Sequence, residues 1–293
     1  MAKHLKKPKR RPLRTAIGLL VPAVLTALFL HWSNTSLKAC SFDPVFADLP
    51  EGFDGCRIVV LADLHSTEFG PQNETLFSAV EAQKPDYIFV AGDLGDRFRG
   101  LPEHYAADTA AGLTAIAPTY YVTGNHEWAA GMIGQLRELF EESGVTYLRN
   151  GYISLFRGGE EILLAGIEDP NGYADQKTPQ EVADTLRAEA GDAFWLLLAH
   201  RNNRFPGEYC RLGADLTLCG HGHGGIWRLP FTDGLISTTM EWFPSWTNGF
   251  YTCFCNQCDS STVFVSRGLG NSPRIPRLFN RPEVAVITLK NSP

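Results

Sequence analysis

Seven side chains of the kinds that bind metal ions follow apolar segments of this sequence. They are two aspartates, one asparagine and four histidines, namely Asp63, His65, Asp93, Asn125, His200, His221 and His223. Carboxylate and amide oxygens combined with imidazole nitrogens suit Mn²⁺, Fe, Zn²⁺ or Co²⁺. Seven ligands are too many for one tetrahedral ion, so the set favours two divalent ions that share one carboxylate. Two ions ~3.5–4 Å apart form a clamp for phosphoryl chemistry, in which a bridging hydroxide becomes the nucleophile because coordination lowers its pKa toward ~7.

The spacing of these residues is compatible with shared sites. Asp63-x-His65 and His221-x-His223 are i, i+2 pairs, which face one side of a strand and can close around one ion on a loop. Glycines around the second pair let the backbone turn freely there. A single histidine at a strand end is more often a hydrogen-bonded structural residue than a ligand. The prediction therefore depends on the conjunction of the motifs, each of which follows an apolar segment.

The elements that must position these residues alternate between strands and helices. The apolar segments before the ligands, predicted as buried strands, are residues 57–62, 87–91, 120–123, 194–199 and 216–219. Helices are predicted at 73–83, 104–115 and 132–143, and from a capping box at Thr178 to Ala190; further strands are predicted at 162–165, 263–266 and 284–289. This alternation indicates an α/β fold, in which strand ends form a crevice where ligands bind.

The motifs together resemble the calcineurin-like metallophosphoesterase family. The family pattern is D-x-H, G-D-x-x-D, G-N-H-[DE], a lone His and G-H-x-H. The matching residues are Asp63–His65, Gly92–Asp96, Gly124–Glu127, His200 and Gly220–His223. The resemblance covers about residues 54–289. The N-terminal segment, the glycines after His223 and residues 266–271 are most similar to the membrane-associated YkuE/YaeI-type branch.

The resemblance implies a fold, a site and an activity. The fold is a four-layer α/β/β/α sandwich, in which two sheets are flanked by helices. Asp63, His65 and His223 bind the first metal, whereas Asn125, His200 and His221 bind the second, and Asp93 bridges them. His126 faces the substrate as the catalytic residue and either protonates the leaving oxygen or stabilises charge on the phosphoryl group, since imidazole donates a proton near neutral pH. Asp96 and Glu127 orient ligands through hydrogen bonds.

The expected activity is hydrolysis of phosphodiester, phosphomonoester or pyrophosphate bonds at two divalent ions. The expected partners are a phosphate-ester substrate, including a lipid-linked or envelope-derived one, and the membrane. The alternative is a non-catalytic module, stabilised by metal, that binds an envelope component. The chain carries a net charge of −6 although residues 1–14 contain seven Lys or Arg and no acid, so the remainder is at −13. Such an acidic body argues against nucleic-acid binding through a basic face.

The N-terminal region is predicted to reach a membrane. Residues 1–14 form a basic cytoplasmic tail, residues 15–32 lack formal charge and end in Trp32, residues 33–53 are a linker, and residues 54–293 are the phosphoesterase domain. Eighteen uncharged residues are near the lower limit of ~17–25 for a spanning helix, and the basic flank predicts a domain outside the cytoplasm, at the cell membrane. A cleaved signal peptide and a lipoprotein signal ending at Cys40 are the alternatives.

Three further features leave alternatives open. The segment with Cys253, Cys255 and Cys258 is a loop that carries a disulfide outside the cytoplasm, or its cysteines are free thiols. A metal site is the least favoured alternative, because three thiols lack a clear fourth ligand. Residues 201–204, which include two arginines, hold substrate phosphate or form a solvated loop. The aromatic residues Trp242, Phe243 and Trp246 contact lipid or sugar, or pack in the ordinary way.

Overall fold

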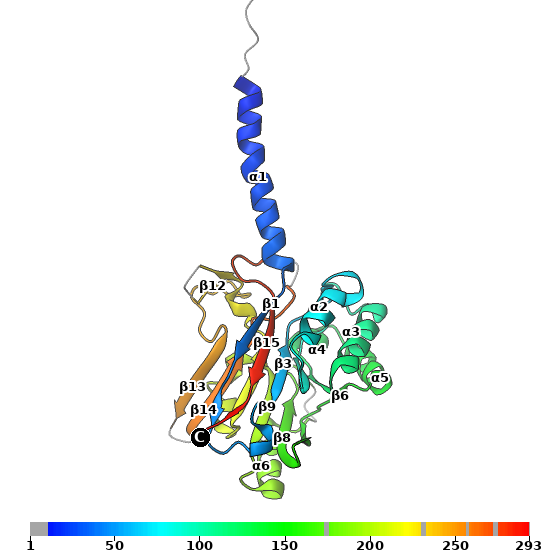
Figure 1. Ribbon diagram of the computed structural model, residues 1–293, viewed down its shortest axis with the longest axis vertical. Coiled ribbons are helices and arrows are strands. Elements are labelled where there is room, and N and C mark those ends of the chain that lie inside the picture. The colour runs from blue at the N-terminus through cyan, green and yellow to red at the C-terminus, as the bar shows by residue number, and fades with distance from the viewer. Residues whose placement is uncertain (1–10, 173–175, 230–232, 256–257, 272–274, 293) are drawn as a thin grey trace, which may run out of the picture.

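The fold was analysed in a computed structural model that describes the backbone of residues 11–172, 176–229, 233–255, 258–271 and 275–292. It also describes their side chains, apart from those of residues 11–15, 17, 254–255 and 258–260. Two six-stranded mixed sheets form the body, and one long helix projects from it (Figure 1). The predicted α/β fold with two sheets is confirmed.

The first sheet has the order β1-β15-β3-β4-β5-β6. Its strands are β1 (Lys38–Phe42), β15 (Glu283–Thr288), β3 (Arg57–Leu61), β4 (Tyr87–Ala91), β5 (Thr119–Val122) and β6 (Thr146–Tyr147). Strands β3 to β6 are parallel neighbours, and β15 runs antiparallel to β3. The carboxyl ends of β3, β4 and β5 therefore lie side by side at one edge of the sheet.

The second sheet has the order β13-β14-β10-β9-β8-β7. Its strands are β13 (Gly249–Cys255), β14 (Cys258–Val265), β10 (Leu216–Gly220), β9 (Trp195–Arg201), β8 (Glu160–Ile167) and β7 (Gly151–Arg157). The four central strands are parallel, and the two edge strands are antiparallel to their neighbours. The ends of β9 and β10 are thus adjacent, as are those of β3 to β5 in the first sheet.

Alternating side chains of the central strands fill different cores. Ile58 and Val60 of β3 pack against Leu196 and Leu198 of β9, so the two sheets face each other. Val59 and its alternating neighbours on the outer face pack against helices α2 (Glu74–Glu81), α3 (Glu103–Ile116) and α5 (Ile133–Ser143). The outer face of the second sheet packs against α6 (Pro179–Ala190). Burial on both faces explains why these strands are continuous apolar segments in the sequence.

The predicted helices lie within two residues of α2, α3, α5 and α6. The predicted capping box is present at α6, where the Thr178 hydroxyl accepts a hydrogen bond from the Glu181 N–H at 3.2 Å. A short helix that was not predicted, α4 (Asn125–Ala129), begins at a candidate ligand. The small pairs β11 (Trp227–Arg228) with β12 (Gly234–Ile236), and β2 (Val45–Phe46) with β16 (Lys290–Asn291), also had no signal in the sequence.

The region between the apolar segment and the domain is more ordered than a linker. Strand β1, which lies within the predicted linker 33–53, pairs in parallel with β15 from Lys38↔Glu283 to Phe42↔Ile287. The pairing is made by backbone groups of residues far apart in the sequence, so no local sequence pattern predicts it. The first sheet therefore begins before residue 54.

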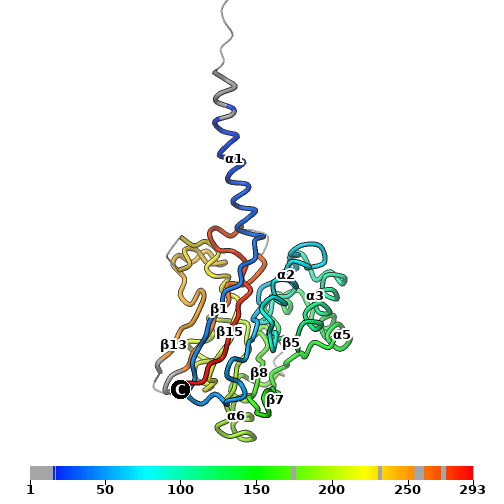
Figure 2. The backbone as a smooth tube through the Cα atoms, viewed as in Figure 1, coloured from blue at the N-terminus to red at the C-terminus, as the bar shows by residue number. Residues whose placement is uncertain are grey.

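Helix α1 (Arg11–Thr35) projects away from the sheets, as the backbone trace in Figure 2 also shows. Its segment Gly18–Thr35 is long and apolar enough to cross a membrane, and only 6% of that segment is buried against the rest of the protein. A signal sequence near an N-terminus satisfies the same length and composition. The observation therefore establishes one apolar N-terminal helix that fits a transmembrane anchor or a signal sequence.

Candidate metal centre

All seven predicted ligands lie at or just beyond the carboxyl ends of five central strands. Asp63 and His65 follow β3, Asp93 follows β4, Asn125 follows β5, His200 is near the end of β9, and His221 and His223 follow β10. Three of these strands belong to the first sheet and two to the second. Because the sheets face each other, their strand ends deliver the seven side chains to one place.

The backbone at most of these positions is left-handed. Asp63, His65, Asp93, His221 and His223 have φ values of 53°, 48°, 53°, 65° and 47°. This conformation is uncommon for residues other than glycine, and such unfavourable conformations persist only where surrounding contacts hold them. Backbone hydrogen bonds between strand ends supply those contacts; for example, the His65 N–H donates to the Asp93 carbonyl at 2.9 Å. The loops are therefore fixed in a conformation that turns the side chains inward.

Close packing also restricts the residue type beside Asp93. A Cβ atom on Gly124 would lie 2.1 Å from the Asp93 Oδ1 atom and 2.6 Å from the Asp93 amide nitrogen. Both distances are far below contact, and one partner is backbone, so any side chain at Gly124 would displace Asp93. The glycine of the G-N-H-E motif is required for this approach.

The side chains form two groups that meet at one carboxylate. In the first group, Nε2 of His223 is 3.1 Å from Nε2 of His65 and 3.6 Å from Oδ1 of Asp63. In the second, Nε2 of His200 is 3.1 Å from Oδ1 of Asn125 and 3.2 Å from Nδ1 of His221. Oδ2 of Asp93 is 3.7 Å from Nε2 of His65 and 3.3 Å from Nε2 of His200. A single oxygen thus faces both groups.

These separations fit metal coordination. Atoms that lie ~2.0–2.2 Å from one ion are roughly 3–3.5 Å apart at octahedral or tetrahedral angles. The nitrogen and oxygen atoms of each group are separated by similar distances, and Asp63, His65 and His223, like Asp63, Asp93 and His200, converge closely enough to hold an ion. The donor set and its geometry therefore suit a dimetal site.

The charges in the cluster point to the same conclusion. Burial by itself would lower the pKa of His200, but the Asp93 carboxylate raises that pKa to about 10. Burial would likewise raise the pKa of Asp93, and the charge of His200 holds it well below the usual range. A histidine that is kept as a cation by buried carboxylates marks a site that requires positive charge, which metal ions supply when they replace the proton.

The two histidines of the last motif are held neutral. Burial lowers the pKa of His221 to about 3 and lowers the pKa of His223 well below its ordinary value. Neutral imidazole is the form that coordinates metals. His221 and His223, which follow β10, therefore need no deprotonation at neutral pH to bind a metal ion.

Two carboxylates, Asp96 and Glu127, lie against the loops that carry the candidate ligands. Glu127 is fully buried and accepts hydrogen bonds from the N–H groups of Gly124 at 2.8 Å, Gly95 at 3.0 Å and Asp93 at 3.2 Å. Oδ2 of Asp96 lies 3.2 Å from Nδ1 of both His65 and His126. Glu127 thus ties the β4 and β5 loops together, and Asp96 faces two rings of the site.

His126 lies between the metal cluster and an open cavity. Its Nδ1 accepts a hydrogen bond from the Arg97 N–H at 3.1 Å, and its own N–H donates to Oδ1 of Asp93 at 2.8 Å. With Nδ1 as the acceptor of this bond, the hydrogen of the neutral ring is on Nε2. Burial lowers the pKa of His126 to about 4, so this neutral form predominates at pH 7.

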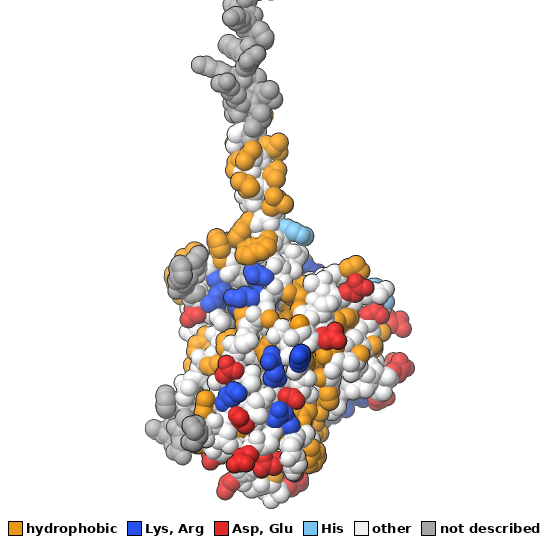
Figure 3. All heavy atoms as spheres, in the orientation of Figure 1, with side chains coloured by type: hydrophobic (Ala, Val, Ile, Leu, Met, Phe, Trp, Pro, Cys, Tyr) orange, Lys and Arg blue, Asp and Glu red, His pale blue; other side chains and the backbone are white. Residues whose placement is uncertain are grey.

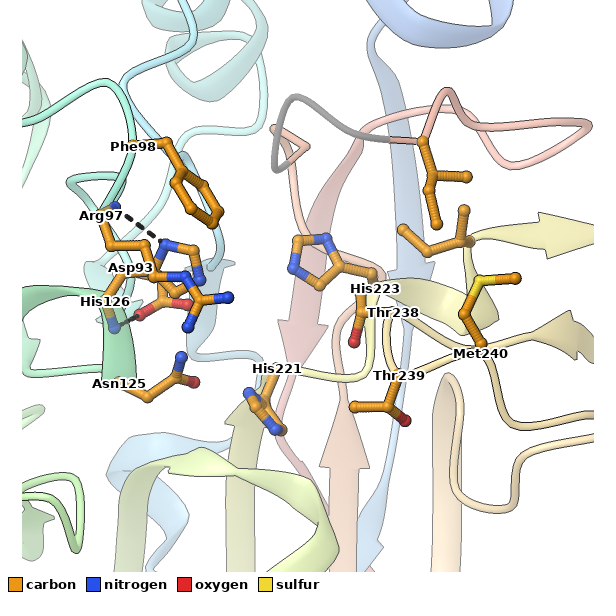
Figure 4. A pocket seen from close by; sticks show the side chains of 12 residues that line it. Asp93, Arg97, Phe98, Asn125, His126, His221, His223, Thr238, Thr239 and Met240 are labelled. Atoms are coloured by element: carbon orange, nitrogen blue, oxygen red, sulfur yellow. Dashed lines mark hydrogen bonds between the residues drawn. The ribbon is translucent and has the colours of Figure 1, made fainter. Parts of the chain in front are cut away.

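The cavity has a volume of about 350 Å³ and two unlike walls. Its floor is formed by Asp93, Asn125, His221 and His223, beside His126. Figure 4 shows Arg97 and Phe98 on the side of His126, and Thr238, Thr239 and Met240 across the cavity. Ile226 and Ile275 complete the less polar wall. The arrangement accommodates a ligand with an anionic part near the floor and a less polar part beside Met240.

Two arginines at the site were not identified from the sequence. Arg97 is the one basic side chain among the described residues that line the cavity. Arg277 is fully buried, and its Nη2 lies 3.3 Å from Nδ1 of His223 and donates to the Gly270 carbonyl at 2.7 Å. Neither belongs to a ligand motif, and their positions depend on contacts between distant segments.

The other sequence features lie elsewhere. Arg201 binds the buried Asp169, with Nη2 at 3.2 Å from Oδ1, and Arg204 pairs with Glu208 at 3.5 Å. Neither arginine lines the cavity, so the structure does not favour the phosphate contact considered for residues 201–204. Trp246 packs against Phe205 and Tyr251 with ring centroids 5.6 and 5.0 Å away.

The cysteine loop is described only in part. Cys253 is a free thiol, whereas the side chains of Cys255 and Cys258 lie outside the described residues. The predicted disulfide in this loop therefore stays a prediction.

Comparison with known sequences identifies the family. The profile of the calcineurin-like phosphoesterases matches residues 56–225, a range that contains all seven candidate ligands. This chain belongs to the calcineurin-like metallophosphoesterase family. It is a metallophosphoesterase with a buried His and Asp cluster suited to metal ions, consistent with a phosphohydrolase.

Curated relatives of this metallophosphoesterase cover most of its length. It is 30% identical to the uncharacterized metallophosphoesterase YkuE of Bacillus subtilis (strain 168), over 83% of this chain and 82% of that protein. It is 29% identical to phosphodiesterase YaeI of Escherichia coli (strain K12), over 80% and 82%. A Danio rerio protein named transmembrane protein with metallophosphoesterase domain is 26% identical, over 95% of this chain and 63% of that longer protein.

Proposed function

We propose that this metallophosphoesterase hydrolyses phosphodiesters at two divalent metal ions. Asp63, His65 and His223 hold one ion, Asn125, His200 and His221 hold the other, and Asp93 is shared. The observation that carries the proposal is Oδ2 of Asp93, which lies 3.7 Å from Nε2 of His65 and 3.3 Å from Nε2 of His200. Mn²⁺, Fe, Zn²⁺ and Co²⁺ all suit this mixture of oxygen and nitrogen donors.

The ions, when bound, stabilise charge on the phosphoryl oxygens and lower the pKa of coordinated water. The protein contributes position and hydrogen bonds. His126 presents Nε2–H to the cavity, because its Nδ1 is occupied by the Arg97 N–H. Burial lowers its pKa to about 4, and neighbouring cations would lower that pKa further. We therefore assign His126 as a neutral hydrogen-bond donor to a substrate oxygen, in preference to an acid that transfers a proton.

Phosphodiesters are favoured over monoesters and pyrophosphates as the substrate class. The cavity offers one arginine, Arg97, for anionic oxygens, and a wall of Ile226, Met240 and Ile275 for a second ester group. A monoester carries more charge and has only one ester group, and a pyrophosphate places more negative charge beside this single arginine. The phosphodiesterase named YaeI, at 29% identity, agrees with this choice.

We also propose that α1 anchors the enzyme as a single span in the cell membrane, with residues 1–14 in the cytoplasm and the catalytic domain outside it. Trp32 near the end of α1 suits the membrane interface, and the basic residues before the span favour this orientation. The relative from Danio rerio that is named a transmembrane protein supports the anchor.

Metal dependence is the direct test of the proposed function. The full chain is stripped with a chelator, and hydrolysis of bis(p-nitrophenyl) phosphate is measured before and after Mn²⁺, Zn²⁺ or Co²⁺ is added back. We expect no turnover in the stripped protein and recovery with at least one ion. Tight binding of two ions without turnover on any diester, monoester or pyrophosphate would contradict the proposal and favour the non-catalytic, metal-stabilised envelope-binding module.

A further inference from the structure

One loop, Ile275 to Arg281, connects the cavity to α1. Ile275 lines the cavity. The Phe279 ring packs against the Phe29 ring of α1 with centroids 4.8 Å apart. The Arg281 guanidinium lies 5.2 Å from the Trp32 ring centre, and its Nε donates to the Ser36 carbonyl at 3.0 Å. The cavity wall and the base of the apolar helix are therefore held together by seven consecutive residues.

The contact with Phe29 sets the position of Phe279 along the axis of α1. Phe29 lies six residues before the end of α1 at Thr35, which corresponds to ~9 Å along a helix axis. Phe279 thus stands beside the apolar part of α1 and not beneath its end. If the segment Gly18–Thr35 crosses a bilayer, Phe279 lies at the level of the lipid.

The same loop pairs through its backbone with a small sheet, and exposed aromatic residues lie next to that sheet. Leu278 forms a bridge with Trp227 of β11, β11 pairs with β12 at Ile236, and Ile236 forms a bridge with Trp242. Neighbouring strands are ~4.8 Å apart, so Trp242 is about three such steps from the loop. Figure 1 shows β12 at the end of the domain from which α1 emerges.

Apolar side chains are exposed along this path. Phe279 is 51% exposed, Met240 59%, Trp242 63% and Phe243 74%, and we call these four residues the docking rim. Figure 3 shows hydrophobic side chains along α1 and around its base. Clustered exposed apolar residues mark interaction sites, and aromatic residues are preferred at membrane interfaces.

We propose that the docking rim lies in the interfacial layer of the bilayer that α1 crosses, so that the cavity opens at the membrane surface and accepts phosphodiesters borne by membrane lipids. This inference rests on the proposed function and on the anchor. Met240 belongs both to the rim and to the cavity wall, and Ile275 lies in the loop that carries Phe279. An apolar strip therefore leads from the bilayer to the less polar wall, and the phosphate of an entering lipid would face the metal cluster and Arg97.

The chemistry of the rim indicates how it binds. The exposed Glu241 precedes Trp242, and the carboxylate of Asp233 is paired with Arg228 at 3.3 Å, so neither adds a free positive charge to the rim. Carboxylates are not attracted to an anionic surface, so insertion of apolar side chains drives the contact. Docking should therefore depend little on salt and on the fraction of anionic lipid.

Fluorescence quenching tests the position of the rim. The full chain is placed in nanodiscs of phosphatidylcholine brominated near the glycerol end of the acyl chains, and the difference between wild type and W242F isolates the emission of Trp242. We expect quenching of Trp242 at low and high salt. If only the other tryptophans, whose emission remains in W242F, are quenched, the docking rim is overturned but the membrane anchor is not. No quenching of either component would overturn both.

Paired substrates with one leaving group test the function of the rim. The variant W242S/F243S is compared with F156S, which removes a 68% exposed phenylalanine from β7 at the far end of the domain. Phosphatidyl-p-nitrophenol in nanodiscs and soluble bis(p-nitrophenyl) phosphate serve as substrates. We expect W242S/F243S to lose at least roughly tenfold in kcat/KM on the lipid, because burial of even one large apolar side chain implies that much. On the soluble diester, W242S/F243S should match wild type, because neither residue lines the cavity.

The outcomes separate this inference from the proposed function. Equal rates of W242S/F243S, F156S and wild type on the lipid would overturn the rim as a docking surface. Turnover of the soluble diester without turnover of the lipid would overturn the lipid-borne substrate. Absence of turnover on both substrates, with ions bound, would instead contradict the proposed function, and the quenching measurement would still decide where Trp242 lies.

Discussion

The floor of the cavity consists of side chains at strand ends, whereas its rim consists of loop residues. On the floor, Asp93 is 1% and His223 3% exposed, and the further candidate ligands Asp63 and His65 are fully buried. On the rim, Met240 and Phe243 are mostly exposed. The floor is held by backbone hydrogen bonds between parallel strands and by Glu127, which accepts three N–H groups. The rim is held by bonds within its own loop, in which the Met240 N–H donates to the Ser237 carbonyl and the Phe243 N–H to the Leu235 carbonyl, both at 3.0 Å.

This difference separates two parts of the activity. In the proposed function, the buried floor holds the ions and positions the phosphorus, and thereby sets the reaction type. The exposed, less polar rim would contact the rest of the substrate and influence substrate choice. Substitutions on the floor should therefore reduce turnover on every substrate, whereas substitutions on the rim should change the rates selectively or raise KM.

The largest effect is expected from Asp93→Asn. The amide keeps the size of the side chain but removes the charge that both ligand groups face, so ion binding and turnover fail together. We expect kcat/KM on bis(p-nitrophenyl) phosphate to fall by roughly 10³-fold or more, since several kcal/mol of transition-state stabilisation depends on the ions. The exposed Asp192→Asn serves as the control. If Asp93→Asn turned over the diester as fast as wild type, the floor could not be the part of the site on which turnover of every substrate depends.

A smaller effect is expected from His126→Ala, at the border of the two regions. Loss of one positioned hydrogen-bond donor should lower kcat by roughly 10²–10³-fold, while both ions stay bound. Steady-state kinetics and metal content of the same preparation give both values. His104→Ala, on the exposed side of α3, is the matched control. If His126→Ala loses an ion, the residue is a ligand and not a donor to substrate.

The smallest effect is expected from Arg97→Ala, on the cavity wall beside His126. The guanidinium is solvent-exposed and lies over the Phe98 ring at 4.7 Å, so its contact with an anionic substrate is screened. We expect KM to rise by about tenfold, with kcat changed less than threefold, consistent with a contact worth ~1.4 kcal/mol. Arg204→Ala should leave both constants unchanged. A fall in kcat at constant KM would place Arg97 with the floor.

The floor was predictable from the sequence because its signals are local. Each ligand type follows an apolar segment, and a strand buried on both faces is apolar throughout, as β4 is from Tyr87 to Ala91. The order of motifs then limited the chemistry. What the sequence could not provide was the left-handed backbone of Asp63 and Asp93, which depends on hydrogen bonds to neighbouring strands.

The rim and the edge of the first sheet were not predictable for a related reason. Strands β11 and β12 have two and three residues, too few for any periodicity, and β1 is paired through its backbone with a strand near residue 283. The positions of Arg97 and Arg277 likewise follow from contacts between distant segments. Exposed aromatic residues such as Trp242 were visible in the sequence, but their place beside α1 required the fold.

The number and position of bound ions test the central claim most directly. Anomalous diffraction from crystals of the full chain grown with Mn²⁺, combined with metal analysis of the same protein, gives both. The account predicts two ions per chain, ~3.5–4 Å apart, with the Asp93 carboxylate between them and the two ligand groups on either side. A single ion, or two ions that do not share Asp93, would contradict it.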